Sequence, residues 1–402
     1  MTTEEAGSSD QWIQLAGSDD PSVAVRTQGV FPLEPSHLVV RLRPRTLQCA
    51  SDAQGALGEL NMAAMGLHNR SRWADSVMQL EMRYSAAHDG VITLTREAQA
   101  VGLRGAVLPV ADERLSRYLK SSQLGVDAAK RGRPTEMMLL ERLSAALTGA
   151  AEGEAPPWRE QPWWQGGLRP EHAYLAAAPP GTNLQEMATR WCTWYNEQQD
   201  MMAVVKITLA YFLLTTIAPF PGSGHLARGM LTTELIRLGV LRDPVLPISK
   251  WLCQHRIALP DLIRGVIERN DLDALVIFVA RGIHTICNEE VTRINSAKSA
   301  FDELLDRFAR KGSMTTLLKA LVINPVTNHA KIAETCNVTT GHAMSMARKL
   351  QKAGVVQILD ARTLEHQSEY NAYGKVIFAP DFMRRLGLSL PSLYEHYPDD
   401  LD

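Results

Sequence analysis

A short glycine-containing loop is the first feature of the sequence with the residue types of a binding site. It reads APFPGSGH from Ala218 to His225, and a helical apolar pattern follows from Leu226. Glycine lets a backbone approach a ligand closely. The first turn of a helix presents unpaired N–H groups and the positive end of the helix dipole. The loop is therefore suited to hold a phosphate or another anion, and a helix start without a ligand is the alternative.

Side chains at this loop carry the candidate chemistry. Ser223 could donate its hydroxyl to a phosphate oxygen or cap the helix. Arg228 could bind an anion or pair with a carboxylate. His225 should have a lowered pKa at a helix N-terminus, and we favour a phosphate-touching or structural role for it over a catalytic one. The expected phosphate-binding set is Gly222, Ser223, Gly224, His225 and Arg228.

The loop and its surroundings resemble the signature of the Fic family, written HxFx[D/E]GNGRxxR. Phe220, Gly222, Gly224 and Arg228 match it outright. The resemblance extends upstream to WWQGG at 163–167 and to a hairpin expected at 171–180, similar to the family's flap. Downstream it includes LIRLGVL from 235 and PVLPIS from 244. It covers roughly residues 45–308.

The resemblance implies transfer of AMP from ATP to a hydroxyl of a target protein, but key residues differ. The position of the family's general base is Ala218, which cannot accept a proton. Pro221 stands where the acidic Mg²⁺ ligand is expected, and the segment is one residue shorter. Ser223 replaces Asn and His225 replaces the first Arg. We therefore predict no catalytic residue and no metal, with His225 as a low-ranked substitute base.

A second segment resembles the family's inhibitory helix, [S/T]xxxE[G/N], whose acidic residue pairs with the last Arg of the signature. It reads EMRYSAAHDG from Glu81 to Gly90. Ser85 and Gly90 match, and Asp89 stands for the Glu. The resemblance implies a contact between Asp89 and Arg228. A capped helix end with an exposed Asp89 is the alternative.

The last part of the chain has another pattern. Helices are expected at 314–323, 329–336 and 340–353, with Thr340 as a cap, followed by strands at 355–359 and 375–378. This order is typical of a winged helix-turn-helix. Residues 314–387 hold nine Lys and Arg against five Asp and Glu, whereas the whole chain has a net charge of −2. The near-neutral net charge of the whole chain thus excludes a uniformly basic nucleic-acid binder, and this module remains the candidate for binding nucleic acid.

Polar and basic residues at the start and along one face of its third helix are the candidate DNA contacts. Packing against another domain or a dimer partner is the alternative use. The candidate residues are Thr339, Thr340, His342, Ser345, Arg348, Lys349 and Lys352.

The predicted fold is mainly α: a Fic-like helical core with a small β-hairpin flap and a C-terminal winged helix-turn-helix domain. Helices are expected in the core at 183–196, 203–217, 226–238, 262–268, 272–288 and 290–309. We divide the chain into a loose tail (1–35), a helical region with the inhibitory-like helix (36–150), the core (151–310), the winged helix (311–390) and an acidic tail (391–402).

The 402 residues have the composition of an ordinary globular chain. Five scattered cysteines form no CxxC pair, so neither a zinc ribbon nor a disulfide framework is indicated. No signal peptide and no apolar run long enough for a bilayer is present. We expect a cytoplasmic protein that does not contact a membrane.

The leading hypothesis is a degenerate Fic-fold regulator that binds ATP or another phosphate-bearing ligand, acts through DNA and transfers little or no AMP. The alternative is an active adenylyltransferase, or another nucleotidyl or phosphoryl transferase, with displaced catalytic residues. A scaffold without ligand is the third. The expected partners are DNA, a target protein at the flap and a second copy of the chain.

Overall fold

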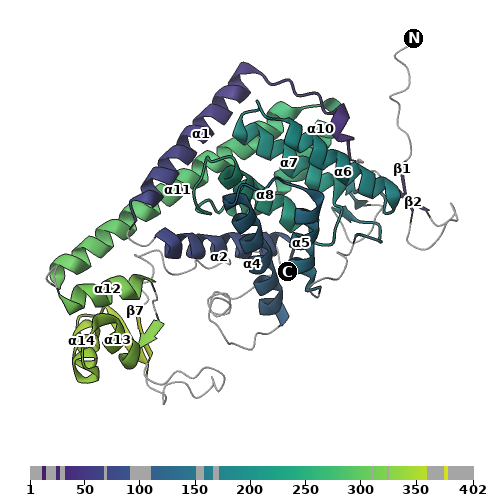
Figure 1. Cartoon of the computed structure of the whole chain (residues 1–402). Coiled ribbons are helices and arrows are strands. Elements are labelled where there is room, and N and C mark those ends of the chain that lie inside the picture. The colour runs from purple at the N-terminus through teal and green to yellow at the C-terminus, as the bar shows by residue number, and fades with distance from the viewer. Residues whose placement is uncertain are drawn as a thin grey trace, which may run out of the picture.

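The computed structural model is mainly α-helical (Figure 1). The expected acidic tail at 391–402 lies outside the described residues. The structure describes residues 11–14, 24–27, 32–67, 70–90, 110–150, 158–165, 172–308, 312–323, 326–359 and 375–378.

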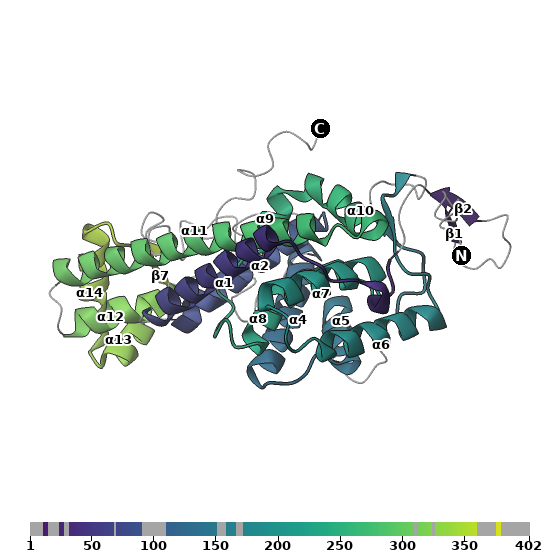
Figure 2. The same ribbon diagram turned by 90° about the horizontal axis from the view of Figure 1, so that it is seen from above.

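Two long helices run side by side along the molecule, α1 (Pro44–Met65) and α11 (Leu272–Arg307) (Figures 1 and 2). The buried residues of α1 recur at three- and four-residue spacing, as in Ala53, Leu57 and Leu60. This spacing forms one apolar face on a helix, which α1 buries against α11.

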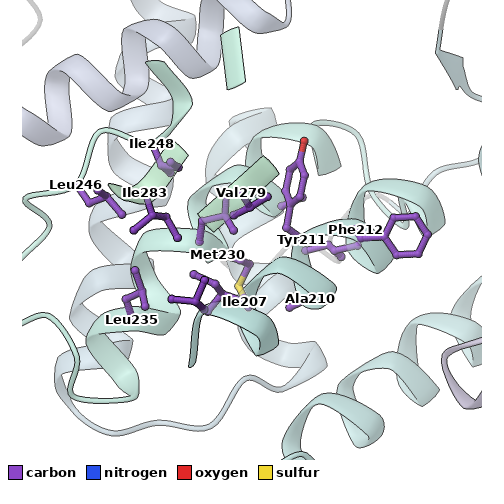
Figure 3. Close-up of a cluster of buried hydrophobic side chains, with 14 of the residues drawn as sticks. Ile207, Ala210, Tyr211, Phe212, Met230, Leu235, Leu246, Ile248, Val279 and Ile283 are labelled. Carbon is purple, nitrogen blue, oxygen red and sulfur yellow. The ribbon is translucent and has the colours of Figure 1, made fainter. Parts of the chain in front are cut away.

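The centre of the molecule is α7 (Ala203–Ile217), a helix that is buried on all sides. It packs against α8 (Ser223–Arg237), α6 (Thr182–Glu197) and α11. Figure 3 shows apolar side chains of α7, α8 and α11 meeting in this core, among them Ile207, Met230 and Ile283. Because α7 cannot move without disturbing the core, the loop between α7 and α8 starts from a fixed point.

Further helices surround α8. They include α2 (Arg70–His88), α4 (Val110–Lys130) and α5 (Met137–Thr148). The short α9 (Ser249–Gln254) packs on α2, and α10 (Leu259–Arg269) packs on α11. The C-terminal end of α2 lies close to the beginning of α8, although Asp89 and Ser223 are 134 positions apart in the chain.

Short antiparallel strands complete the described core. β3 (Trp164–Gln165) pairs with β4 (Leu175–Ala176), and we call this hairpin the flap. The sequence predicts both strands of this hairpin within 171–180. In the structure the first strand, β3, lies before that segment. β1 (Gln11–Gln14) pairs with β2 (Ala24–Thr27) inside the segment that we expected to be a loose tail.

The C-terminal elements lie beside the last turns of α11 (Figure 2). They are α12 (Ser313–Ile323), β5 (Val326–Asn328), α13 (His329–Cys336), α14 (Thr340–Lys352), β6 (Val356–Leu359) and β7 (Lys375–Phe378). The three strands form an antiparallel sheet in the order β5-β7-β6. Their helices share a separate apolar core with the last turns of α11, from Ala300 onward.

Several expected boundaries were wrong. α8 begins at Ser223, not Leu226, because Gly222 adopts a left-handed conformation (φ 80°) that starts the helix directly after it. α11 runs without a break through residues 288–290, since its buried positions keep helical spacing there, as in Cys287, Glu290 and Ile294. The cap of α14 is Thr339 rather than Thr340, because the Thr339 hydroxyl accepts the His342 N–H.

In the part of the chain that the structure describes, every helix is too short or too polar to cross a membrane.

Candidate functional site

The loop between α7 and α8 is held by its own backbone and by Ser223. The Ser223 hydroxyl accepts the Phe220 N–H at 2.9 Å and donates to the Phe220 carbonyl at 2.7 Å. Its side chain is buried. The hydroxyl thus closes the turn of the loop, and both of its described bonds are to the protein rather than directed at a ligand position.

Ala218 ends α7 in a left-handed conformation, with φ 46° and ψ 62°. This conformation is unusual for a residue other than glycine. Its N–H bonds the Leu214 carbonyl, and its own carbonyl accepts a bond from Arg159. The methyl side chain offers no proton acceptor, so this position cannot supply a general base.

Arg228 is the charged centre of the site, and its side chain is only 3% exposed. Its Nη2 atom forms an ion pair with Asp89 Oδ2 at 2.7 Å. Nε donates to the Ser85 hydroxyl at 2.8 Å, and Nη2 also donates to the Ser85 carbonyl at 2.9 Å. The contact between Asp89 and Arg228 that the sequence suggested is therefore present, and the end of α2 supplies it.

The carboxylate of Asp89 lies over the first turn of α8. A Cβ atom built on Gly224 would be 3.5 Å from Asp89 Oδ1 and 3.2 Å from Arg228 Nη1. Glycine at this position thus leaves the space that the ion pair occupies. Because the N-terminal turn of a helix favours an anion, the position that Asp89 occupies is a candidate anion site. We call this place, the first turn of α8 with Arg228, the anion site.

Tyr118, which no sequence pattern singles out, belongs to the same arrangement. Its hydroxyl donates to Asp89 Oδ2 at 2.9 Å, and its ring stacks on His225 with centroids 4.1 Å apart. Burial, the charge of Asp89 and the hydrogen bond to it all raise the pKa of Tyr118. Tyr118 therefore remains a neutral donor that holds the Asp89 carboxylate in place.

The charge state of the ion pair follows from its neighbours. Burial alone would raise the pKa of Asp89, but the charge and hydrogen bond of Arg228 outweigh it and lower the pKa. Burial, followed by the charge of Arg228, lowers the pKa of His88 to about 4. At neutral pH the site thus holds one carboxylate and one guanidinium beside a neutral imidazole.

The surroundings of His225 do not suit a substitute general base. Its ring is 2% exposed and its Nδ1 atom lies 2.7 Å from the Ser85 hydroxyl. Burial, followed by the charge of Arg228, lowers its pKa to about 3. The buried ring is therefore neutral at pH 7, and its Nδ1 atom is already bonded to the Ser85 hydroxyl.

Arg159 is a second residue that the sequence analysis missed, and it connects the loop to the flap. It is buried, and its guanidinium donates to the carbonyls of Ala218, Gln161 and Ala178. Its backbone N–H also bonds the Pro219 carbonyl. An isolated Arg in a Pro- and Trp-rich segment gives no pattern from which these long-range bonds could be predicted.

The candidate DNA contacts lie far along the chain from this site, on α14 and its cap. The buried face of α14 consists of Ala343, Met346, Ala347 and Leu350, which pack in the second apolar core. The opposite face carries the residues expected to meet DNA, and all of them are exposed: Thr339, Thr340, His342, Ser345, Arg348, Lys349 and Lys352.

Comparison with known proteins shows the fold. No protein-family model matches the sequence. The structure is similar to a Fic family protein from Desulfovibrio desulfuricans, with a TM-score of 0.54 and 13% identity over 85% of this chain and 98% of that chain. The chain thus has the fold of Fic family proteins over most of its length.

Two further solved structures are similar at lower scores. One is a Fic domain containing signaling protein from Bacteroides thetaiotaomicron, with a TM-score of 0.49, 16% identity and coverage of 60% of this chain and 95% of that chain. The other is Fic-1 from C. elegans, with a TM-score of 0.47, 16% identity and coverage of 63% and 74%.

Proposed function

We propose that this Fic-fold chain is a regulatory protein that binds a phosphate-bearing ligand and transfers little or no AMP. The observation that carries the proposal is the buried Arg228 at the first turn of α8, paired with the carboxylate of Asp89. A buried guanidinium whose charge is paired with one partly exposed carboxylate can exchange that carboxylate for a phosphate. Asp89 thus regulates access to the anion site.

The residues of the loop support the lack of transfer. Ala218 provides no base and Pro221 provides no carboxylate. The carboxylate that does reach the anion site, Asp89, is bonded to Arg228 and Tyr118. Since Mg²⁺ is bound through carboxylates and phosphates, these residues do not fit the metal site that the fold family implies, and we derive no step through a metal.

ATP and pyrophosphate are the ligands with which to test the anion site by isothermal titration calorimetry. Asp89→Asn keeps the shape of the side chain and removes its charge, so it should bind either ligand about tenfold more tightly than the wild type. Arg228→Lys replaces a forked donor by a point charge and should weaken binding. Equal affinity of the wild type and both variants would overturn the assigned site.

A transfer assay separates this proposal from the active-enzyme alternative. The protein is incubated with Mg²⁺, ATP labelled at its α-phosphate and a cell lysate, with Asp89→Asn run beside the wild type. We expect no covalent label above that of a heat-inactivated control. Covalent, Mg²⁺-dependent labelling by either protein would favour a transferase that uses displaced residues.

A second proposed activity is DNA binding by the C-terminal elements. We infer a winged helix-turn-helix from the order α12, β5, α13, α14, β6, β7, and in this proposal α14 is the recognition helix. The specific support is the exposed face of α14, where Arg348, Lys349 and Lys352 have no acidic residue on the same helix. Such a face is suited to phosphate contacts.

A further inference from the structure

A cavity lies between α2, α4 and α8, with His225 in its wall. Residues 218–224 of the loop do not line it, and neither do Ser85, Asp89 or Arg228, so the cavity does not include the ion pair of the anion site. It holds about 40 Å³ of space for the centres of water-sized molecules. That is room for about three waters at roughly 10–15 Å³ each.

The walls of the cavity are mostly apolar and adaptable. Three methionines from two helices, Met78, Met82 and Met230, line it together with leucines such as Leu143 and Leu246. Methionine side chains are unbranched and polarisable, and they change shape to fit different neighbours. The walls can therefore move apart for an occupant that is larger than the present space.

Most polar side chains of the cavity wall are bonded to the protein: Glu81 to Ser249, Ser121 to the Leu143 carbonyl and Thr232 to the Leu246 carbonyl. The Nε2 atom of His225 lies 3.4 Å from the Ser122 hydroxyl, which is a long contact for a hydrogen bond. The Nδ1 atom of the same ring is bonded to Ser85 at 2.7 Å, and the ring stacks on Tyr118. These two contacts fix the orientation of the ring, so Nε2 stays at the cavity wall beside the Ser122 hydroxyl, which also contacts Met82 Sδ at 2.9 Å.

We propose that this cavity binds a small, mostly apolar molecule that carries one hydrogen-bonding group, which pairs with His225 Nε2 or the Ser122 hydroxyl. An apolar wall favours apolar surface and rejects ions. The adjacent His225 Nε2 and Ser122 hydroxyl favour molecules with one hydroxyl, carbonyl or amine group. The way in lies along Ser122, Gly229 and Thr233, the partly exposed residues of the lining on α4 and α8.

Phenol is a suitable probe because it joins an apolar ring to one hydroxyl. The full-length protein is labelled with ¹³C at the methionine methyl groups and titrated with phenol. We expect saturable shifts of the methyl signals assigned to Met78, Met82 and Met230. Toluene, which lacks the hydroxyl, should bind several-fold more weakly because one neutral hydrogen bond is lost, a change of about 1 kcal/mol.

Two glycine variants form a matched pair. Gly229 lines the cavity, and a Cβ built there has no atom within 4 Å, so Gly229→Leu should fold and fill the opening. Gly55 on the exposed side of α1 has equally open space and lies outside the cavity, so Gly55→Leu is the control for helix propensity. We expect Gly229→Leu to bind phenol at least about tenfold more weakly, and Gly55→Leu to bind it as the wild type does.

Several outcomes would overturn the proposal. They are the absence of saturable methyl shifts in the wild type, equal phenol affinity of Gly229→Leu and the wild type, and toluene binding as tightly as phenol. The first of these uses the unchanged protein, so the proposal stays testable even if a variant fails to fold.

Discussion

Asp89 and Arg228 are 139 positions apart in the sequence, and their side chains meet at 2.7 Å at the first turn of α8. The arginine is almost fully buried, whereas 27% of the aspartate side chain is exposed. The partner of a buried charge is thus held at the edge of the solvent, where a competing anion can reach it.

The ion pair should contribute measurably to stability. Removing one partner of a buried pair leaves the other charge uncompensated, so the single changes Asp89→Arg and Arg228→Asp should each lower the free energy of unfolding strongly. The double reversal should recover about 2 kcal/mol of that loss. Urea unfolding of the four proteins measures this coupling, and strict additivity would show that the two residues do not interact.

Arg159 should determine where the flap lies. Arg159→Ala leaves three carbonyl acceptors without their donor, two of them in buried bonds, and should destabilise the protein by about 3 kcal/mol. Arg159→Lys can serve fewer of these acceptors and should recover part of the loss. Hydrogen exchange at the N–H groups of Ala177 and Tyr174, which bond Trp163 and Gln165 across the flap, should accelerate in both variants.

Exchange in helices remote from the flap is the control for Arg159. A purely global loss of stability would lower the free energy of opening, measured by hydrogen exchange, by the same amount in α7 and in the flap. A positioning role predicts a larger effect at Ala177 and Tyr174, with partial rescue by lysine.

Glu81 should make stability depend on pH. Burial raises its pKa to about 7, although the hydrogen bonds from Ser249 oppose the shift. Because the folded protein then binds this proton more tightly than the unfolded chain, stability from this group should fall as pH rises from about 4.5 to about 7. The total loss of stability is about 3 kcal/mol, and this stability is not regained at higher pH.

Glu81→Gln removes the titrating group and keeps an acceptor for Ser249. The difference in unfolding free energy between variant and wild type should therefore shift in favour of the variant between pH 5 and pH 8. Glu59→Gln, at an exposed position of α1, is the control. A pH-independent difference for Glu81→Gln would contradict the raised pKa.

DNA binding by α14 should depend steeply on salt. Affinity for a short mixed-sequence duplex, measured by fluorescence anisotropy, should fall as salt rises because phosphate contacts release counterions. Lys349→Ala should reduce the slope of log affinity against log salt by about 1. Lys319→Ala, at an exposed position of α12, should leave the slope unchanged. Affinity without salt dependence would argue for a protein partner.

Local patterns were enough to predict much of the fold. The bounds of α7 and α13 agree with the expected helices, since apolar spacing and flanking turn residues define each helix within its own segment. The helix start near Gly222 was missed by three residues because the left-handed glycine begins the helix earlier than the apolar pattern does. The mainly helical Fic-like fold was predicted from an ordered series of partial matches and is confirmed by structural similarity.

Around the anion site, too, the sequence predicted some features and only the structure showed the others. Residue types alone determined that position 218 carries no base and position 221 no carboxylate, because alanine and proline lack the groups. Only the tertiary structure decided that Tyr118 holds Asp89, that Arg159 joins the loop to the flap and that the ring of His225 faces a cavity. These contacts join helices and loops that are distant in the chain, and no local spacing encodes which side chains meet when the helices pack.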